Sequence, residues 1–106
     1  MIQKIVFFIS WPLNKRDFTR FGADLLAKNG FEVCFYDFSD LLYPGLGRAT
    51  IPDRIDSDRY PRFKERHAAV SAISALDEKC FVVVMFDFDK EACWIYQALS
   101  RIFLNI

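Results

Sequence analysis

A short polar stretch after the first apolar run holds the side chains best suited to bind a ligand. Ser10, Asn14, Lys15 and Arg16 supply a hydroxyl, an amide and two cations, and Trp11 adds a flat aromatic ring. A helix should begin here, and its free backbone N–H groups and dipole favour an anion. The ring could stack on a sugar or base, or simply cover the end of the sheet. The stretch suggests an anionic or sugar ligand, with a polar loop that only caps a helix as the simpler alternative.

Three aspartates follow the two later apolar runs. Asp87 and Asp89 form an Asp-Phe-Asp sequence, a spacing that can hold a divalent metal and a nucleotide diphosphate because alternate residues of an extended segment point the same way. A strand-end aspartate followed by a helix-capping aspartate explains the same pair, so no metal site is predicted. Asp37 could accept a ribose hydroxyl, as acids at this position do in dinucleotide-binding folds.

Motifs specific to one chemistry are absent from the sequence. Neither GxGxxG nor GxxxxGK[ST] occurs, which argues against a classical dinucleotide or P-loop site, and no cofactor is predicted. The single histidine, His67, lies in a helical pattern with no nucleophile readable beside it. No catalytic residue can therefore be assigned.

Alternating strand and helix patterns must position these side chains. Apolar runs without alternation indicate strands buried on both faces, and apolar residues at helical spacing follow each run. Asp17 and Asp89 are candidate helix caps, and Asn29-Gly30 should end the first helix. The expected strands are residues 5–9, 31–36 and 81–86; the expected helices are 18–28, a short turn at 39–43, one from 62 onward and one from 90 onward; and 44–61 is an irregular loop.

The order βαβαβα predicts a Rossmann-like α/β domain with a three-stranded parallel sheet. Right-handed crossovers that put helices on both faces give the strand order 2-1-3. The switch point then lies between strands 1 and 3, where ligands bind in such folds. Residues 10–17 and 87–90 should therefore be neighbours at the carboxyl edge of the sheet.

Composition bounds the class of protein. The 106 residues suit a single domain, and 53% apolar residues with twelve phenylalanines exclude a disordered chain. Fourteen basic residues balance fourteen acidic ones, so no nucleic-acid partner is expected. Three cysteines without a CxxC pattern favour reduced thiols in the cytoplasm, with a place at the inner face of the membrane left open. No apolar run is long enough to cross a membrane.

Two features predict that the chain works with a partner. Three strands are few for a doubly wound sheet, and the open edge beside the third strand is an aggregation hazard. The last helix has an apolar arc too wide for one sheet to cover. We therefore expect residues 1–106 to be the N-terminal part of a larger two-domain protein, or to form a homodimer.

The first 43 residues also carry a resemblance. KIVFFISWPLNKRDFTRFGADLLAKNGFEVCFYDFSDLL resembles the opening of bacterial surface-polysaccharide biosynthesis proteins of the glycosyltransferase GT-B type. The resemblance implies an N-terminal domain that receives the sugar acceptor, with Ser10, Trp11, Asn14 and Arg16 lining the acceptor side of the cleft. It also implies a C-terminal domain that holds the nucleotide sugar, without which this chain would be inactive.

A different class of protein is the alternative. A stand-alone flavodoxin-like or receiver-like interaction module would use Asp37, Asp87 or Asp89 as a phospho-acceptor or metal ligand. The sequence shows no lysine and threonine set to accompany such an acid. A small hydrolase or transferase active as a homodimer is a third possibility.

Overall fold

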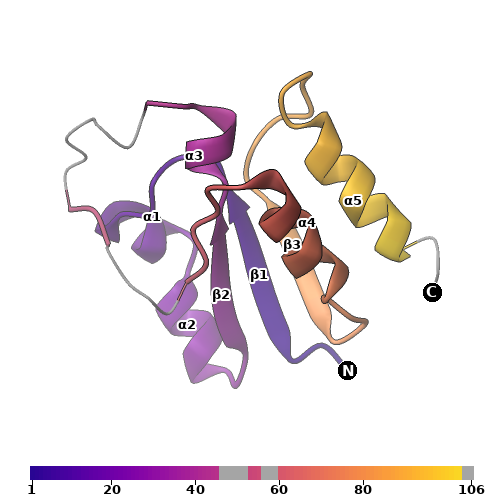
Figure 1. Ribbon diagram of the computed structural model, residues 1–106. Coiled ribbons are helices and arrows are strands. Elements are labelled where there is room, and N and C mark those ends of the chain that lie inside the picture. The colour runs from indigo at the N-terminus through magenta and orange to yellow at the C-terminus, as the bar shows by residue number, and fades with distance from the viewer. Residues whose placement is uncertain (46–52, 56–59, 104–106) are drawn as a thin grey trace.

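The structure is a computed structural model that describes residues 1–45, 53–55 and 60–103. Its centre is a parallel sheet of three strands, β1 (Lys4–Ile9), β2 (Glu32–Asp37) and β3 (Cys80–Val84), in the order β2-β1-β3 (Figure 1). In the register, Val6 of β1 lies between Cys34 and Val82. The predicted α/β class and strand order are confirmed.

Two short helices cover one face of the sheet, at its β2 side. They are α1 (Lys15–Arg20) and α2 (Ala23–Lys28). Beneath them Phe7 stacks on Phe21 and Phe35, with ring centroids 5.5 and 5.2 Å apart. Such aromatic pairs stabilise the fold by more than the burial of their apolar surface alone.

Two longer helices cover the other face. They are α4 (Arg66–Ser74), which crosses in front of β3 in Figure 1, and α5 (Cys93–Phe103), which packs beside α4 and is drawn beyond the β3 side of the sheet. Phe8 points into this layer and packs on Tyr36 and Phe38, while Ile73 and Ile95 bury the inner faces of the two helices. Because successive side chains of β1 point to opposite faces, one apolar run supplies both layers, and the prediction of helices on both faces is confirmed.

The first helix differs from the prediction. Residues 18–28 were expected to form one helix, but Gly22 adopts a left-handed conformation with φ of +74° and separates α1 from α2. The cap is Asn14, not Asp17: the Asp17 N–H donates to Asn14 Oδ1 over 2.9 Å. Because the break redirects the chain, Leu25 of α2 is 65% exposed.

The second crossover helix begins later than expected. It starts at Arg66 rather than residue 62, because residues 61–63 run beside the end of β2. The Asp37 N–H donates to the Pro61 carbonyl and the Phe63 N–H to the Asp37 carbonyl. The expected turn after β2 forms α3 (Ser39–Leu42). Of the expected loop 44–61, residues 46–52 and 56–59 lie outside the described part.

The last element also starts late. The helix expected from residue 90 begins at Cys93, because Asp89 closes the preceding turn: its Oδ1 accepts the Ala92 N–H over 2.9 Å. The wide apolar arc of α5 meets its own neighbours in part. Trp94 packs edge-on against Phe38, and Tyr96 donates to the Phe86 carbonyl over 2.8 Å.

Candidate functional site

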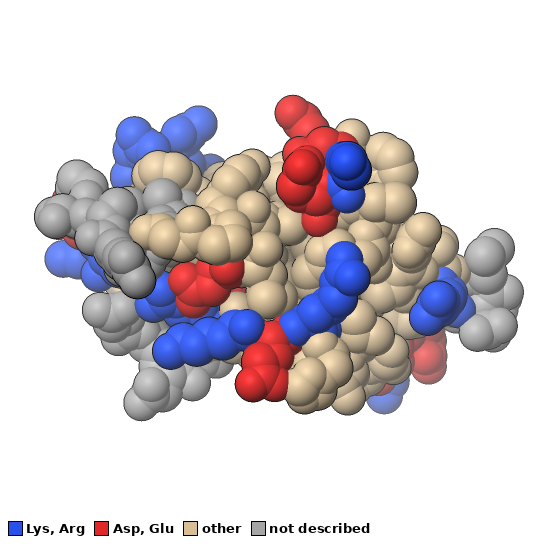
Figure 2. Space-filling model, turned by 45° about the horizontal axis from the view of Figure 1, so that its top comes forward, with Lys and Arg blue, Asp and Glu red and all other residues tan. Residues whose placement is uncertain are grey.

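The predicted site residues all lie toward the carboxyl edge of the sheet. The register pairs Ile9 with Asp37 and Phe8 with Val84, so the loop after β1, the end of β2 and the turn after β3 leave the sheet at the same edge. Figure 2 brings this end of the molecule forward and shows acidic and basic side chains close together. No large area of one sign stands out there, as the balanced composition suggests.

The loop between β1 and α1 is held by Asn14, which is buried. Its Nδ2 donates to the Pro12 carbonyl and to Asp17 Oδ2, over 3.1 and 3.0 Å, and its Oδ1 accepts the Asp17 N–H. The loop also pairs with a distant segment, because the Ile55 N–H donates to the Leu13 carbonyl and the Lys15 N–H to the Asp53 carbonyl. The amide of Asn14 thus shapes the loop rather than facing solvent.

Other side chains of this loop face outward. Trp11 is 47% exposed, Lys15 and Arg16 are exposed, and Ser10 is half-buried beside them in the sequence. Arg16 Nε lies 3.7 Å from Asp17 Oδ1, a weak exposed ion pair that leaves the guanidinium accessible. The loop therefore presents an aromatic ring and two cations on a hydrogen-bonded frame.

Asp37 lies at the end of β2 and is buried. Its Oδ1 accepts the Ser39 N–H over 2.8 Å at the start of α3. Burial raises the pKa of this carboxyl, while Ser39 and the charge of Arg62 oppose the rise. The Ser39 hydroxyl is fully buried and makes no hydrogen bond of regular geometry. Asp37 thus anchors a turn, and a ribose would have to displace structure to reach it.

Asp87 and Asp89 lie in the turn between β3 and α5, and both are exposed. Asp89 accepts the backbone N–H of Ala92. The negative charges of both aspartates also affect the pKa of the nearby Tyr96. Burial raises the pKa of Tyr96, and both aspartates raise it further. Among the described residues no three His, Cys, Asp or Glu side chains gather to hold a metal ion.

An ion pair that the sequence does not signal joins α3 to the segment after the long loop. Arg62 Nε and Nη2 donate to the two carboxylate oxygens of Asp40 over 2.7 and 3.0 Å. The residues are 22 positions apart, so only the fold brings them together. The bidentate geometry fixes residues 61–63 against the end of β2.

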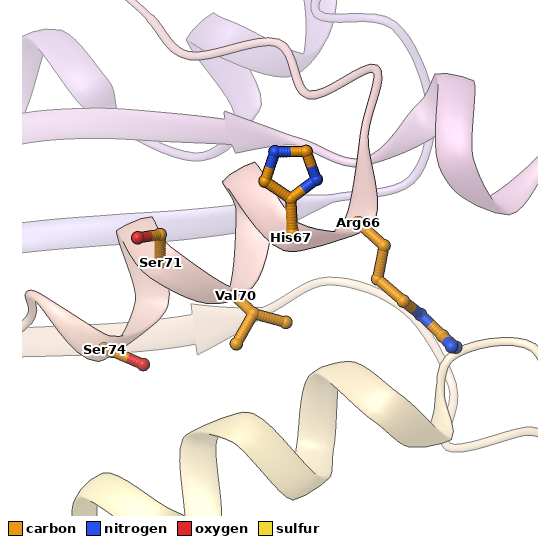
Figure 3. A pocket seen from close by; sticks show the side chains of 5 residues that line it. All are labelled: Arg66, His67, Val70, Ser71 and Ser74. Carbon is orange, nitrogen blue, oxygen red and sulfur yellow. The ribbon is translucent and has the colours of Figure 1, made fainter.

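An open hollow of about 710 Å³ lies along the outer side of α4 (Figure 3). Arg66, His67, Val70, Ser71 and Ser74 line it, and all come from this one helix. Arg66 lies over the Trp94 ring, 4.7 Å from its centroid, and His67 Nε2 is 3.3 Å from Glu65 Oε2. The side chain of His67 is 82% exposed. The residues form a shallow surface without a nucleophile and base pair.

A smaller hollow of about 380 Å³ lies beside β2 and α2. Its lining includes Phe18, Phe31, Cys34 and Tyr60. Burial raises the pKa of the Cys34 thiol, which keeps it protonated and unreactive. We find no arrangement for acid–base or nucleophilic chemistry in either hollow.

The predicted site residues therefore lie at the carboxyl edge of a parallel sheet. No helix among the described residues is long and apolar enough to pass through a bilayer. Comparisons with protein families, with curated proteins and with solved structures find no significant match to this chain. Its function must therefore be argued from its own residues.

Proposed function

We propose that this chain is the acceptor-side domain of a glycosyltransferase-like protein in cell-surface polysaccharide biosynthesis. The observation that supports it most is the loop after β1, which exposes Trp11, Lys15 and Arg16 beside the switch point between β1 and β3. Aromatic rings stack on sugar faces, and cations beside them suit an acceptor with acidic groups. The resemblance of the first 43 residues to such proteins points the same way.

The frame of this loop favours binding over a merely polar turn. Buried Asn14 and the backbone bonds to residues 53–55 hold the loop in one conformation. A preorganised loop loses less conformational entropy when a ligand binds. Trp11 would be the stacking surface, Lys15 and Arg16 the charged contacts, and Ser10 a hydroxyl partner.

Catalysis under this proposal needs a second domain. The exposed pair Asp87 and Asp89 stands on the same edge, but among the described residues it belongs to no group of three His, Cys, Asp or Glu side chains that could hold a metal ion. A nucleotide sugar would therefore be held by a C-terminal domain that closes over this edge. The intact mass of the protein in its source cell tests this: a longer product with a second α/β domain supports it, and a product of these 106 residues counts against it.

The binding role can be tested by NMR with free hexoses and hexuronic acids as probes. Millimolar sugar should shift the indole N–H signal of Trp11 and leave that of Trp94 unchanged. Lys15→Ala should weaken the shift for a hexuronic acid, whereas Lys28→Ala, which removes an exposed lysine from the other end of the helical pair, should not. No sugar-dependent shift at Trp11 would overturn the proposal.

The same samples distinguish the alternative module. Titration with Mg²⁺ should leave the signals of residues 87–89 unchanged if this edge receives a sugar acceptor. Tight Mg²⁺ binding that Asp87→Ala abolishes would instead favour the receiver-like module.

A further inference from the structure

The outer edge of β3 has unused backbone groups. The Met85 N–H donates to the Phe8 carbonyl, and the Lys79 carbonyl accepts the Lys4 N–H. The backbone N–H and carbonyl groups of the odd-numbered residues along this strand therefore point toward β1. The N–H and carbonyl groups of Val82 and Val84 therefore point away from the sheet. Among the described residues none hydrogen-bonds to them, in contrast to the end of β2, which residues 61–63 cover.

The face of β3 on the side of α1 and α2 is only partly covered by the described residues, because Val83 packs against the core while Phe81 and Met85 stay exposed. Phe81, Val83 and Met85 lie on this face, in line with Ile5 and Phe7 of β1. Both short helices lie at the β2 side (Figure 1), and Phe81 and Met85 are 54% and 42% exposed. An exposed edge next to exposed large apolar side chains, with no proline or inward-pointing charge, is a surface suited to strand addition.

We propose that β3 pairs with β3 of a second copy of this chain, antiparallel about a two-fold axis at Val83. This inference does not rest on the proposed function. The Cys80 N–H already donates to the Asp77 carbonyl over 3.1 Å, so a register that pairs Cys80 with Val84 of the second copy would lack a donor. The register centred on Val83 pairs Val82 with Val84 in both directions. It uses every outward group of these two residues and joins the two sheets into one of six strands.

The side chains agree with this register. It sets Phe81 opposite Met85 of the second copy, in a close pair that allows a sulfur–aromatic contact. It also brings Lys79, which precedes the strand, beside Asp87 of the second copy, which follows it, and both side chains are exposed. The pairing of Lys79 with Asp87 is available only in the antiparallel arrangement, because a parallel one would set each residue beside its own copy.

The first test is the mass of the chain in solution by light scattering and sedimentation. At about 100 μM we expect a dimer, because a small interface of this kind gives micromolar affinity. Val84→Pro should give a monomer, since it removes an outward N–H and no bond within the sheet. Val33→Pro is the matched control, because its N–H points away from β1 and donates to no backbone group among the described residues, and it should stay dimeric. A monomeric native chain, or a dimer that survives Val84→Pro, would overturn the proposal.

The second test reverses the charges. Lys79→Glu and Asp87→Lys should each weaken the dimer about tenfold, because each change makes two repulsive pairs across the axis. The double variant should recover most of the affinity. Equal weakening by the single and double variants would contradict the register, and circular dichroism confirms that each variant is folded.

The third test fixes the axis by cross-linking. In a chain with Cys80→Ser and Cys93→Ser, Val83→Cys should form a disulfide-linked dimer on mild oxidation, because the axis brings this position next to itself. Phe81→Cys, opposite Met85 of the second copy, should cross-link far less. The reverse pattern would overturn the proposed axis. This test also stays informative if Val84→Pro fails to fold.

Discussion

Asn14 and Asp37 are buried polar side chains that hold together the carboxyl edge of the sheet. Asn14 makes three hydrogen bonds within the loop after β1, and Asp37 fixes the start of α3. Both residues are buried. Their neighbours Trp11, Lys15 and Arg16 are the ones left to meet a ligand.

Removal of the Asn14 side chain should destabilise the protein. Asn14→Ala deletes the helix cap and leaves the buried Pro12 carbonyl without its donor, so we expect a loss of about 1–3 kcal/mol of unfolding free energy in urea titrations. Asn29→Ala is the control, because its side chain donates to the Leu25 carbonyl on the exposed end of α2. A loss as small as that of the control would mean that water replaces the Asn14 bonds.

Asp37 should make stability depend on pH. Burial raises its pKa in the folded state above the ordinary 3.8, so the folded state holds the proton more tightly than the unfolded state does. This carboxyl therefore costs stability as pH rises from 3.8 through the raised pKa, and the cost is absent below that window. Asp37→Asn keeps an oxygen to accept the Ser39 N–H but does not titrate.

A comparison of the native chain with Asp37→Asn isolates the contribution of Asp37 to the pH dependence of stability. The unfolding free energy of Asp37→Asn minus that of the native chain should increase across the window and then stay constant up to pH 7. Urea titrations at half-unit steps of pH give the curve, in which the other carboxyl groups cancel. A difference that falls as pH rises would show that the charged form is favoured by Ser39 and Arg62.

At the scale of elements, Gly22 decides the shape of the first crossover. It has φ of +74°, and a Cβ added to it would meet nothing within 4 Å. A side chain would therefore fit at this position, and it is the left-handed backbone conformation that favours glycine. The break aims Phe21 and Ala23 at the sheet while Leu25 turns outward.

Substitution at this glycine should follow backbone preference. Gly22→Ala should cost about 1 kcal/mol of unfolding free energy, because a left-handed conformation is strained for a residue with a Cβ. Gly22→Asn should cost less, since asparagine tolerates this conformation better than alanine. If alanine is neutral or stabilising, α1 and α2 can merge into one helix, which the exposure of Leu25 argues against.

At the scale of the whole molecule, the sheet is covered unevenly. The helices that pack on the sheet leave Phe81 and Met85 exposed on one face of β3. In contrast, β1 is hydrogen-bonded to a strand on each side, and its side chains are packed on both faces. Local stability should therefore be greatest in the centre and least at the edges.

Hydrogen exchange should map this gradient. We expect the slowest amides in β1, at Val6 and Phe8, and fast exchange at Val33, whose N–H points away from β1 and has no backbone acceptor among the described residues. Val84 should exchange fast in dilute protein and slowly in concentrated protein, because only dimerisation protects it. Protection of Val84 that does not depend on concentration would point to a partner group within the chain.

The sequence by itself determines much of this protein. Unalternated apolar runs indicate strands buried on both faces, and right-handed crossovers with helices on both faces then give the order 2-1-3. The edge where Trp11, Lys15, Asp37 and Asp87 gather follows from that order. Periodicity carries this information because it depends only on neighbours along the chain.

Only the tertiary structure decides how each of these side chains is used. Asn14 becomes a buried cap, Asp37 a turn anchor and Leu25 a surface residue because the contacts that set their roles come from distant segments or from the break at Gly22. The same holds for Phe81 and Met85, whose strand pattern reads as buried on both faces. They are exposed because α1 and α2 pack at the β2 side, a placement that no local pattern in β3 encodes.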